Sequence, residues 1–170
     1  MLTTTLWAAQ IILALFFLFA GVPKILGRGI DRWIGFDDVP RALSLLIGIA
    51  EVAASVALVV PMLLGAFEWT TPLAAVGIAV MTLMASGFHT RAGGLREWLC
   101  AVETAMWAML AGVVAIGRWE LLATGPSLAP DLLVPVAVVL VIALVVNIVA
   151  VLRMPTPASA PARSSEEAHV

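Results

Sequence analysis

Glu51 is the only charged residue in the apolar run from Leu45 to Val60. A charged side chain at the centre of a membrane helix costs ~2.5–3.5 kcal/mol on insertion scales, so a carboxyl group in such a segment needs a partner or a function. It can donate or accept a proton, and burial away from water keeps it mostly protonated. Glu51 is therefore the first candidate for a catalytic residue.

Three small residues share a helical face with Glu51. Their spacing of i, i+4, i+7 and i+11 places all four on one side of a helix, whose other faces carry Leu, Ile, Val and Ala. We call this set the polar stripe: Ser44, Gly48, Glu51 and Ser55. We expect the polar stripe to face the interior of a helix bundle, and its residues are the candidate ligand-binding surface.

Three more ionisable side chains occur in or at the ends of other apolar segments: Lys24, His89 and Glu103. Lys24 follows Pro23, where a helix kinks or ends because proline has no N–H group. If successive helices alternate in direction, these three side chains approach the same half of the bundle, just below Glu51. Four ionisable groups from four helices then converge, and all four are candidates for catalysis.

Each of these residues also has a purely structural interpretation. Glu51 and Lys24 could neutralise each other and fix the register of two helices. Lys24 could instead extend its ammonium group to the lipid headgroups. His89 is also consistent with a position at the membrane interface, and Glu103 with a contact to Arg96 two turns away. The sequence leaves these alternatives open.

The composition is that of an integral membrane protein. Apolar residues form 62% of the 170 residues and charged residues only 12%, with a mean hydropathy of +1.10. Soluble domains are about a quarter charged, so we expect lipid to be the main surrounding of this chain. The net charge of −2 argues against a nucleic-acid partner. Cys100 is the single cysteine, which excludes an internal disulfide, and we expect no metal site and no cofactor held by the chain.

Five apolar segments are near the ~20 residues that a helix needs to cross a membrane. Lone strands are excluded there, because lipid leaves their backbone groups unpaired. The expected spans are residues 6–22, 42–67, 72–88, 98–117 and 132–152. After Arg153 the chain is rich in Pro, Ala and Ser, which predicts a disordered tail.

The distribution of lysine and arginine predicts the orientation. With the N-terminus outside, eight basic residues lie on the cytoplasmic side and one, Arg118, lies outside. The reverse orientation inverts this ratio. We therefore expect a multipass protein of the plasma membrane or bacterial inner membrane, with its N-terminus outside and its C-terminus in the cytoplasm.

Two short motifs resemble those of DoxX-like membrane proteins. The segment LFAGVPKIL, residues 18–26, is similar to the family's F-x-x-x-G-x-x-K-L at the end of the first helix. Residues 48–61 are similar to its G-x-x-E-x-x-G-x-x-x-L-x-x-P, with Ala54 where the family has glycine. The resemblance covers about residues 6–119 and includes the sequence Gly117-Arg118-Trp119.

This resemblance implies an all-α fold, a compact four-helix membrane core over residues 1–119. A connection and a fifth transmembrane helix would follow at 120–153, and a cytoplasmic tail at 154–170. The resemblance also implies a link to quinol chemistry, because the family takes its name from a component associated with a terminal quinol oxidase. A wider similarity to sterol-isomerase-like bundles implies a cavity that admits lipophilic molecules.

Four functions fit these residues. The first is a redox-associated subunit of a membrane complex that contacts a quinone or another lipophilic molecule around Glu51. The others are a non-catalytic carrier of a lipophilic ligand, an isomerase-like enzyme with Glu51 and Glu103 as proton donor and acceptor, and a structural membrane subunit. No haem-ligand pair, iron–sulfur spacing or flavin fingerprint occurs in the sequence, so a redox role requires electrons from a partner or substrate. The sequence does not decide whether the chain is an enzyme.

Overall fold

A computed structural model describes residues 2–28, 39–92 and 95–126, together with the single positions Pro135, Val138 and Ile142. Four α-helices follow one another, and a short 3-10 helix closes the described part. They are α1 (Leu2–Leu26), α2 (Arg41–Leu64), α3 (Thr70–Ala92), α4 (Leu95–Gly117) and η2 (Trp119–Thr124). This part of the chain contains no strand, which confirms the predicted all-α membrane bundle.

All four α-helices are long and apolar enough to cross a membrane, which confirms the first four predicted spans. Three of them, α1, α3 and α4, extend several residues beyond the predicted limits. The predicted fifth span at 132–152 and the predicted tail at 154–170 lie outside the described residues, apart from the three single positions.

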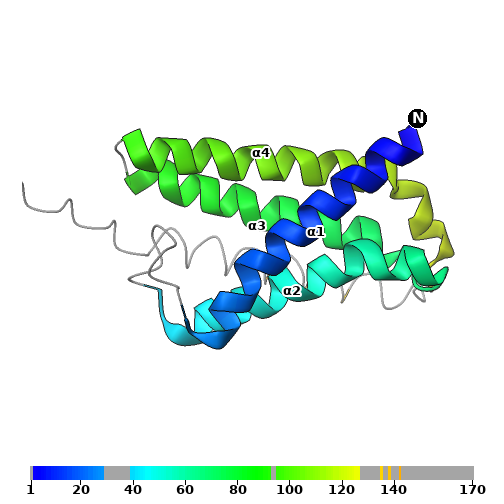
Figure 1. Ribbon diagram of the computed structural model, residues 1–170, viewed down its shortest axis with the longest axis horizontal. Helices are drawn as coiled ribbons and strands as arrows, with labels where there is room; N and C mark the ends of the chain where they lie inside the picture. Colours follow the sequence, from blue (N-terminus) through cyan, green and yellow to red (C-terminus); the bar gives the residue numbers. More distant parts are fainter. Residues whose placement is uncertain are drawn as a thin grey trace, which may run out of the picture.

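The helices form two pairs, α1 with α2 and α3 with α4, and the pairs pack together mainly through α2 and α3. Figure 1 shows α1 crossing the bundle obliquely, with its N-terminal part beside the end of α4 and its C-terminal part beside the start of α2. The two ends of α1 therefore make contacts with two different helices, and each end has its own group of buried polar side chains.

Proline and glycine together set the end of α1. Pro23 lies inside the last turn, and Gly27 follows four residues later with a φ of 68°. The backbone N–H of Arg28 donates to the carbonyl oxygen of Pro23 at 3.2 Å, the hydrogen bond of a Schellman cap. The helix thus continues for three residues after the proline and ends at a residue that tolerates the left-handed conformation.

The same signal ends α2. Pro61 precedes Gly65, which has a φ of 63°, and the backbone N–H of Ala66 donates to the carbonyl oxygen of Pro61 at 3.1 Å. The helix therefore stops at Leu64, and the prediction that it continues to Phe67 is wrong. The apolar run continues past the glycine, so hydropathy alone does not reveal the end.

The bundle core is made of apolar side chains from all four helices. Among its buried members are Leu13, Phe17, Leu58, Ile78 and Val114. Large apolar side chains also cover the outside. Phe19, for example, is 82% exposed and Ile116 is 79% exposed. An apolar exterior of this extent is stable in lipid, because its side chains contact apolar lipid tails and not water.

Candidate functional site

The backbones of α1 and α2 touch at Gly21 and Gly48. A Cβ atom on Gly21 would lie 2.8 Å from the carbonyl oxygen of Gly48, and a Cβ atom on Gly48 would lie 2.8 Å from the carbonyl oxygen of Gly21. Side-chain carbons do not approach backbone oxygens this closely, so neither position accepts a larger residue without a shift of a helix. Small residues permit this kind of contact between membrane helices. The crossing fixes the register of α1 against α2.

This crossing brings Lys24 and Glu51 together. The ammonium Nζ of Lys24 donates to both carboxylate oxygens of Glu51, at 2.5 and 2.6 Å. Both residues are 4% exposed. Leaving one charge of such a buried pair without its partner is strongly destabilising, because the interior solvates a lone charge poorly. The pair therefore links α1 to α2 and cancels the charge of each residue.

Further hydrogen bonds hold the two charged residues in place. Arg41, the first residue of α2, donates to the carbonyl oxygen of Lys24, and its Nη2 donates to that of Ile25 at 2.6 Å. These carbonyl groups at the end of α1 have no intrahelical partner, and a cation there also complements the helix dipole. Ser55 Oγ donates to the backbone carbonyl oxygen of Glu51 at 2.8 Å. The ion pair is thus built on firmly positioned backbone.

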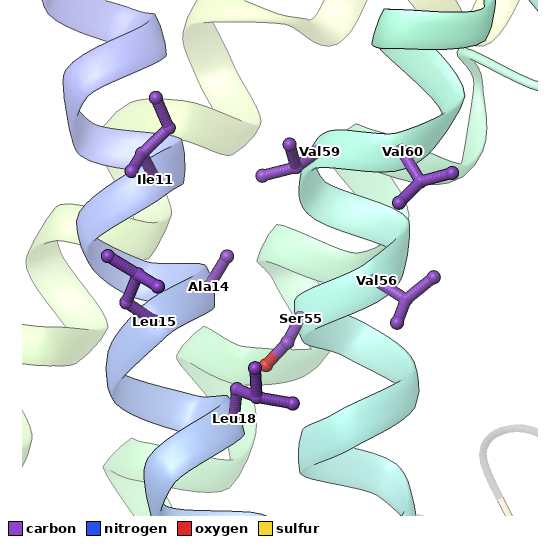
Figure 2. Close-up of a pocket in the computed structure, with 8 residues that line it drawn as sticks. All are labelled: Ile11, Ala14, Leu15, Leu18, Ser55, Val56, Val59 and Val60. Carbon is purple, nitrogen blue, oxygen red and sulfur yellow. The ribbon is translucent and has the colours of Figure 1, made fainter.

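An apolar groove of about 240 Å³ lies between α1 and α2 (Figure 2). Its lining consists of Ile11, Ala14, Leu15, Leu18, Ser55, Val56, Val59 and Val60. Several of these side chains are exposed, Leu15 by 59% and Val56 by 49%, so the groove opens on the lipid-facing surface. Figure 2 shows the Ser55 hydroxyl as the polar atom among these apolar side chains. Ser55 is one helical turn from Glu51, so it is the lining residue nearest to the ion pair along α2, although neither Lys24 nor Glu51 lines the groove.

A second buried polar group lies where the first part of α1 meets the end of α4. Arg118 Nε donates to Gln10 Oε1 at 2.9 Å. Gln10, which is fully buried, donates through Nε2 to the carbonyl oxygen of Leu58 at 2.7 Å and to the sulfur of Met62 at 3.3 Å. The guanidinium of Arg118 also lies over the ring of Trp7, 5.8 Å from its centroid. These contacts tie α1, α2 and the end of α4 together.

The architecture and its two motifs agree with a comparison against models of protein families. The family model described as the DoxX-like family matches residues 8–113. The chain belongs to the DoxX-like family. Comparisons with curated proteins and with solved structures gave no match. In this DoxX-like chain, the matched residues include both members of the Gly21–Gly48 crossing and both members of the ion pair, so the two short motifs meet in one structural unit.

The predicted orientation of the polar stripe is confirmed. Ser44, Gly48, Glu51 and Ser55 are all buried on one face of α2. They have different surroundings, however. Gly48 packs against Gly21, Glu51 is paired with Lys24, and Ser55 alone of the four lines the groove. A role of the whole stripe in ligand binding stays a prediction.

The structure excludes one of the alternatives left open for Lys24, and one expectation about the four ionisable candidates is wrong. Lys24 does not extend to the headgroups, because its side chain is buried against Glu51. The four ionisable groups do not converge either. Glu103 is exposed on α4 and accepts a hydrogen bond from Trp107 Nε1 at 3.3 Å, because α4 turns its alanines towards the core instead.

His89 has a partner that the sequence reading did not consider. Its Nδ1 lies 2.6 Å from the carboxylate Oε2 of Glu97, near the start of α4. The pair links α3 to α4, whereas Lys24 and Glu51 link α1 to α2. His89 is therefore a contact within the second helix pair.

Sequence reasoning also missed Gln10 and Arg118. Gln10 is not among the predicted site residues, and Arg118 enters the prediction only as a basic residue on the outer side and as part of the family resemblance. An amide side chain inside an apolar helix was the available signal, because such a group needs a hydrogen-bond partner in lipid or in the bundle. No spacing rule relates it to a residue more than a hundred positions away.

Proposed function

We propose that this DoxX-like chain binds a lipophilic molecule of the quinone class in the α1–α2 groove. In this proposal Lys24 and Glu51 provide the polar contact and a site for a proton. The chain would act as a subunit of a membrane redox complex in a bacterial inner membrane, with its N-terminus outside. The observation that supports this most is a buried ion pair one helical turn along α2 from Ser55, a residue that lines an apolar groove open towards lipid.

The chemistry of the pair suits a quinone or quinol headgroup. An ammonium group can donate a hydrogen bond to a quinone carbonyl oxygen, and a carboxylate can accept the proton that a quinol hydroxyl releases on oxidation. Oxidation of a quinol releases two protons and two electrons. Glu51 would accept one proton at a time, and a redox partner subunit would accept the electrons.

The size of the groove limits what can bind there. Pockets that enclose drug-sized ligands usually measure about 300–1,000 Å³, and this groove is about 240 Å³. It therefore suits one ring or a short part of a hydrocarbon chain, with the remainder of the molecule in the surrounding lipid. To reach the ion pair, a headgroup must pass Ser55, the polar lining residue closest to Glu51 along α2.

A second candidate function is structural, and one observation favours it. Both carboxylate oxygens of Glu51 already accept hydrogen bonds from Lys24. In this view the pair only holds α1 and α2 in register, and the chain supports a larger membrane assembly without binding a ligand of its own.

A double variant separates the two candidates. Lys24→Met/Glu51→Met removes both charges but keeps side chains of similar length, and such replacements of buried ion pairs are often neutral or stabilising. The measurement is quinone bound to the purified protein, by mass spectrometry, and binding of an added short-chain quinone. If the polar contact is required, the double variant folds but binds at least about tenfold more weakly. Unchanged binding by the double variant would eliminate the ion pair as the quinone contact.

A second pair of variants tests whether the apolar groove holds the ligand. Ala14→Phe places a ring in the groove, whereas Ala50→Phe places the same ring on an exposed part of α2 away from it. We expect the first variant to lose quinone binding and the matched control to keep it. Gly48→Leu is unsuitable for this purpose, because its side chain would separate α1 from α2.

A further inference from the structure

Arg118 carries a buried positive charge that no carboxylate neutralises within the part of the chain that the structure describes. The residue is 8% exposed, and its Nη2 atom has no hydrogen-bond partner among those residues. The ion pairs found there join other residues, Lys24 to Glu51 and His89 to Glu97. A buried charge is strongly unfavourable unless it is paired and hydrogen-bonded. The surroundings of Arg118 therefore favour a negatively charged partner.

The neighbours of Arg118 hold its guanidinium in one orientation. Gln10 Oε1 accepts a hydrogen bond from Nε at 2.9 Å, and Gln10 is itself fixed by its hydrogen bond to the carbonyl oxygen of Leu58. The ring of Trp7 lies against the guanidinium, within the range of a cation–π contact. A guanidinium group can donate hydrogen bonds to an oxyanion through two of its three nitrogens at once. Nη2 is the donor that this arrangement leaves unused.

We propose that Arg118 binds an oxyanion, a phosphate or carboxylate group, at the end of the bundle where α1 begins and α4 ends (Figure 1). The group can belong to a membrane amphiphile or to a free anion. Nη2 is covered by protein atoms, so the oxyanion has to displace a side chain. Trp7 is suited to this movement, because it is only half-buried and lies on the guanidinium.

This site does not depend on the quinone proposal. Gln10 and Arg118 lie towards the other end of α1 from Lys24, and neither residue lines the groove. Failure of quinone binding would leave the oxyanion site unaffected, and the reverse also holds.

The test uses the full-length protein in a neutral maltoside detergent, which supplies no oxyanion. Inorganic phosphate, dodecanoate and phosphatidylglycerol are added separately, and the thermal unfolding midpoint is followed as a function of their concentration. We expect a saturable rise of the midpoint, because a ligand that binds only the folded state stabilises it. A rise with inorganic phosphate shows that a free anion suffices. A rise with phosphatidylglycerol or dodecanoate alone shows that an amphiphile is required.

The variant Arg118→Gln is compared with Arg96→Gln. Arg118 follows the last residue of α4 and is buried, whereas Arg96 lies in the first turn of α4 and is exposed. We expect Arg118→Gln to bind roughly tenfold to a hundredfold more weakly, as for the loss of a charged hydrogen bond. Arg96→Gln should bind as the unmodified chain does. The proposal is overturned if neither variant changes the response, or if the unmodified chain shows no saturable response to any of the three anions.

Gln10→Glu keeps the proposal testable even if Arg118→Gln does not fold. This variant puts a carboxylate where the amide oxygen now lies, 2.9 Å from Nε. We expect it to abolish the response to oxyanions, because Arg118 then has its counter-charge. The variant also loses the hydrogen bond that Gln10 Nε2 donates to the carbonyl oxygen of Leu58, so the response to added oxyanion is the readout, not the midpoint in plain detergent. An undiminished, saturable response to oxyanions in Gln10→Glu would contradict the proposal.

Discussion

Gly21 and Gly48 fit against each other reciprocally. Each presents its carbonyl oxygen 2.8 Å from the point where the other would carry a Cβ atom. The same crossing places the Cβ of Glu51 at 3.0 Å from that point on Gly21, and the Cβ of Lys24 at 2.8 Å from that point on Gly48. Each glycine therefore lies beside the charged residue of the opposite helix. In each motif the charged residue follows the glycine by three positions, Lys24 after Gly21 and Glu51 after Gly48. The contact between the glycines therefore also brings the two charged side chains together.

Alanine at either glycine should therefore separate the helices. We expect Gly21→Ala and Gly48→Ala each to destabilise the folded protein by about 1–3 kcal/mol, the usual cost of overpacking. Gly77→Ala is the matched control, because Gly77 is exposed on α3 and its Cβ would meet nothing within 4 Å. The measurement is unfolding in mixed micelles. Equal stability of all three variants would contradict the close crossing.

The ion pair should show strong coupling between its members. Glu51→Leu alone removes the carboxylate that accepts from the buried ammonium of Lys24, at an expected cost of about 3–5 kcal/mol. The double variant Lys24→Met/Glu51→Leu should recover most of that loss, because no lone charge remains. A double-mutant cycle on the free energy of unfolding measures this coupling. Additive effects of the two single variants would show that the two side chains do not form a pair in the membrane.

The helices could be predicted from sequence because each one is an apolar segment long enough to span lipid. The inward face of α2 was also predictable, since Ser44, Gly48, Glu51 and Ser55 recur with helical spacing. This periodicity is a property of one helix, so it does not depend on how the neighbouring helices pack.

The partners of the charged residues were not predictable in the same way. Glu103 and Glu51 look alike in sequence, as single carboxylates in apolar runs. The structure exposes the first and buries the second, because the rotation of each helix is set by side chains that it meets on other helices. Gln10 meets Arg118 only through the oblique path of α1 across the bundle. The resemblance to the family did not indicate this contact.

The two helix-ending glycines allow the cost of backbone strain to be separated from the cost of a contact. Gly27 and Gly65 share a positive φ, but a Cβ on Gly27 would lie 3.2 Å from the guanidinium of Arg41, whereas one on Gly65 would meet nothing within 4 Å. We expect Gly65→Ala to cost about 1 kcal/mol from conformation alone. Gly27→Ala should cost more, because it also disturbs the hydrogen bonds that Arg41 donates to the end of α1. Unfolding free energies measured side by side test the order, and a larger loss in Gly65→Ala would refute it.

Ser44 provides a test of whether the polar stripe meets a ligand. Its hydroxyl is buried and has no hydrogen-bond partner among the described residues. A buried hydroxyl without a partner is unfavourable, so Ser44→Ala should be neutral or should stabilise the protein by up to about 1 kcal/mol. Ser86→Ala is the contrasting variant, because Ser86 Oγ donates to the carbonyl oxygen of Ala101 across α3 and α4 at 2.8 Å. It should lose about 1 kcal/mol.

The same two serine variants should differ in quinone binding if the stripe takes part in it. A Ser44→Ala protein that is as stable as the unmodified chain but binds quinone more weakly would show that the hydroxyl bonds to the ligand. Unchanged binding would restrict the polar contact to Glu51, Lys24 and Ser55, of which only Ser55 lines the groove. Ser86→Ala should leave binding unchanged in both cases, because its contact lies within the α3–α4 pair. Loss of binding in that variant would mean that quinone affinity follows the stability of the whole bundle and not a local contact.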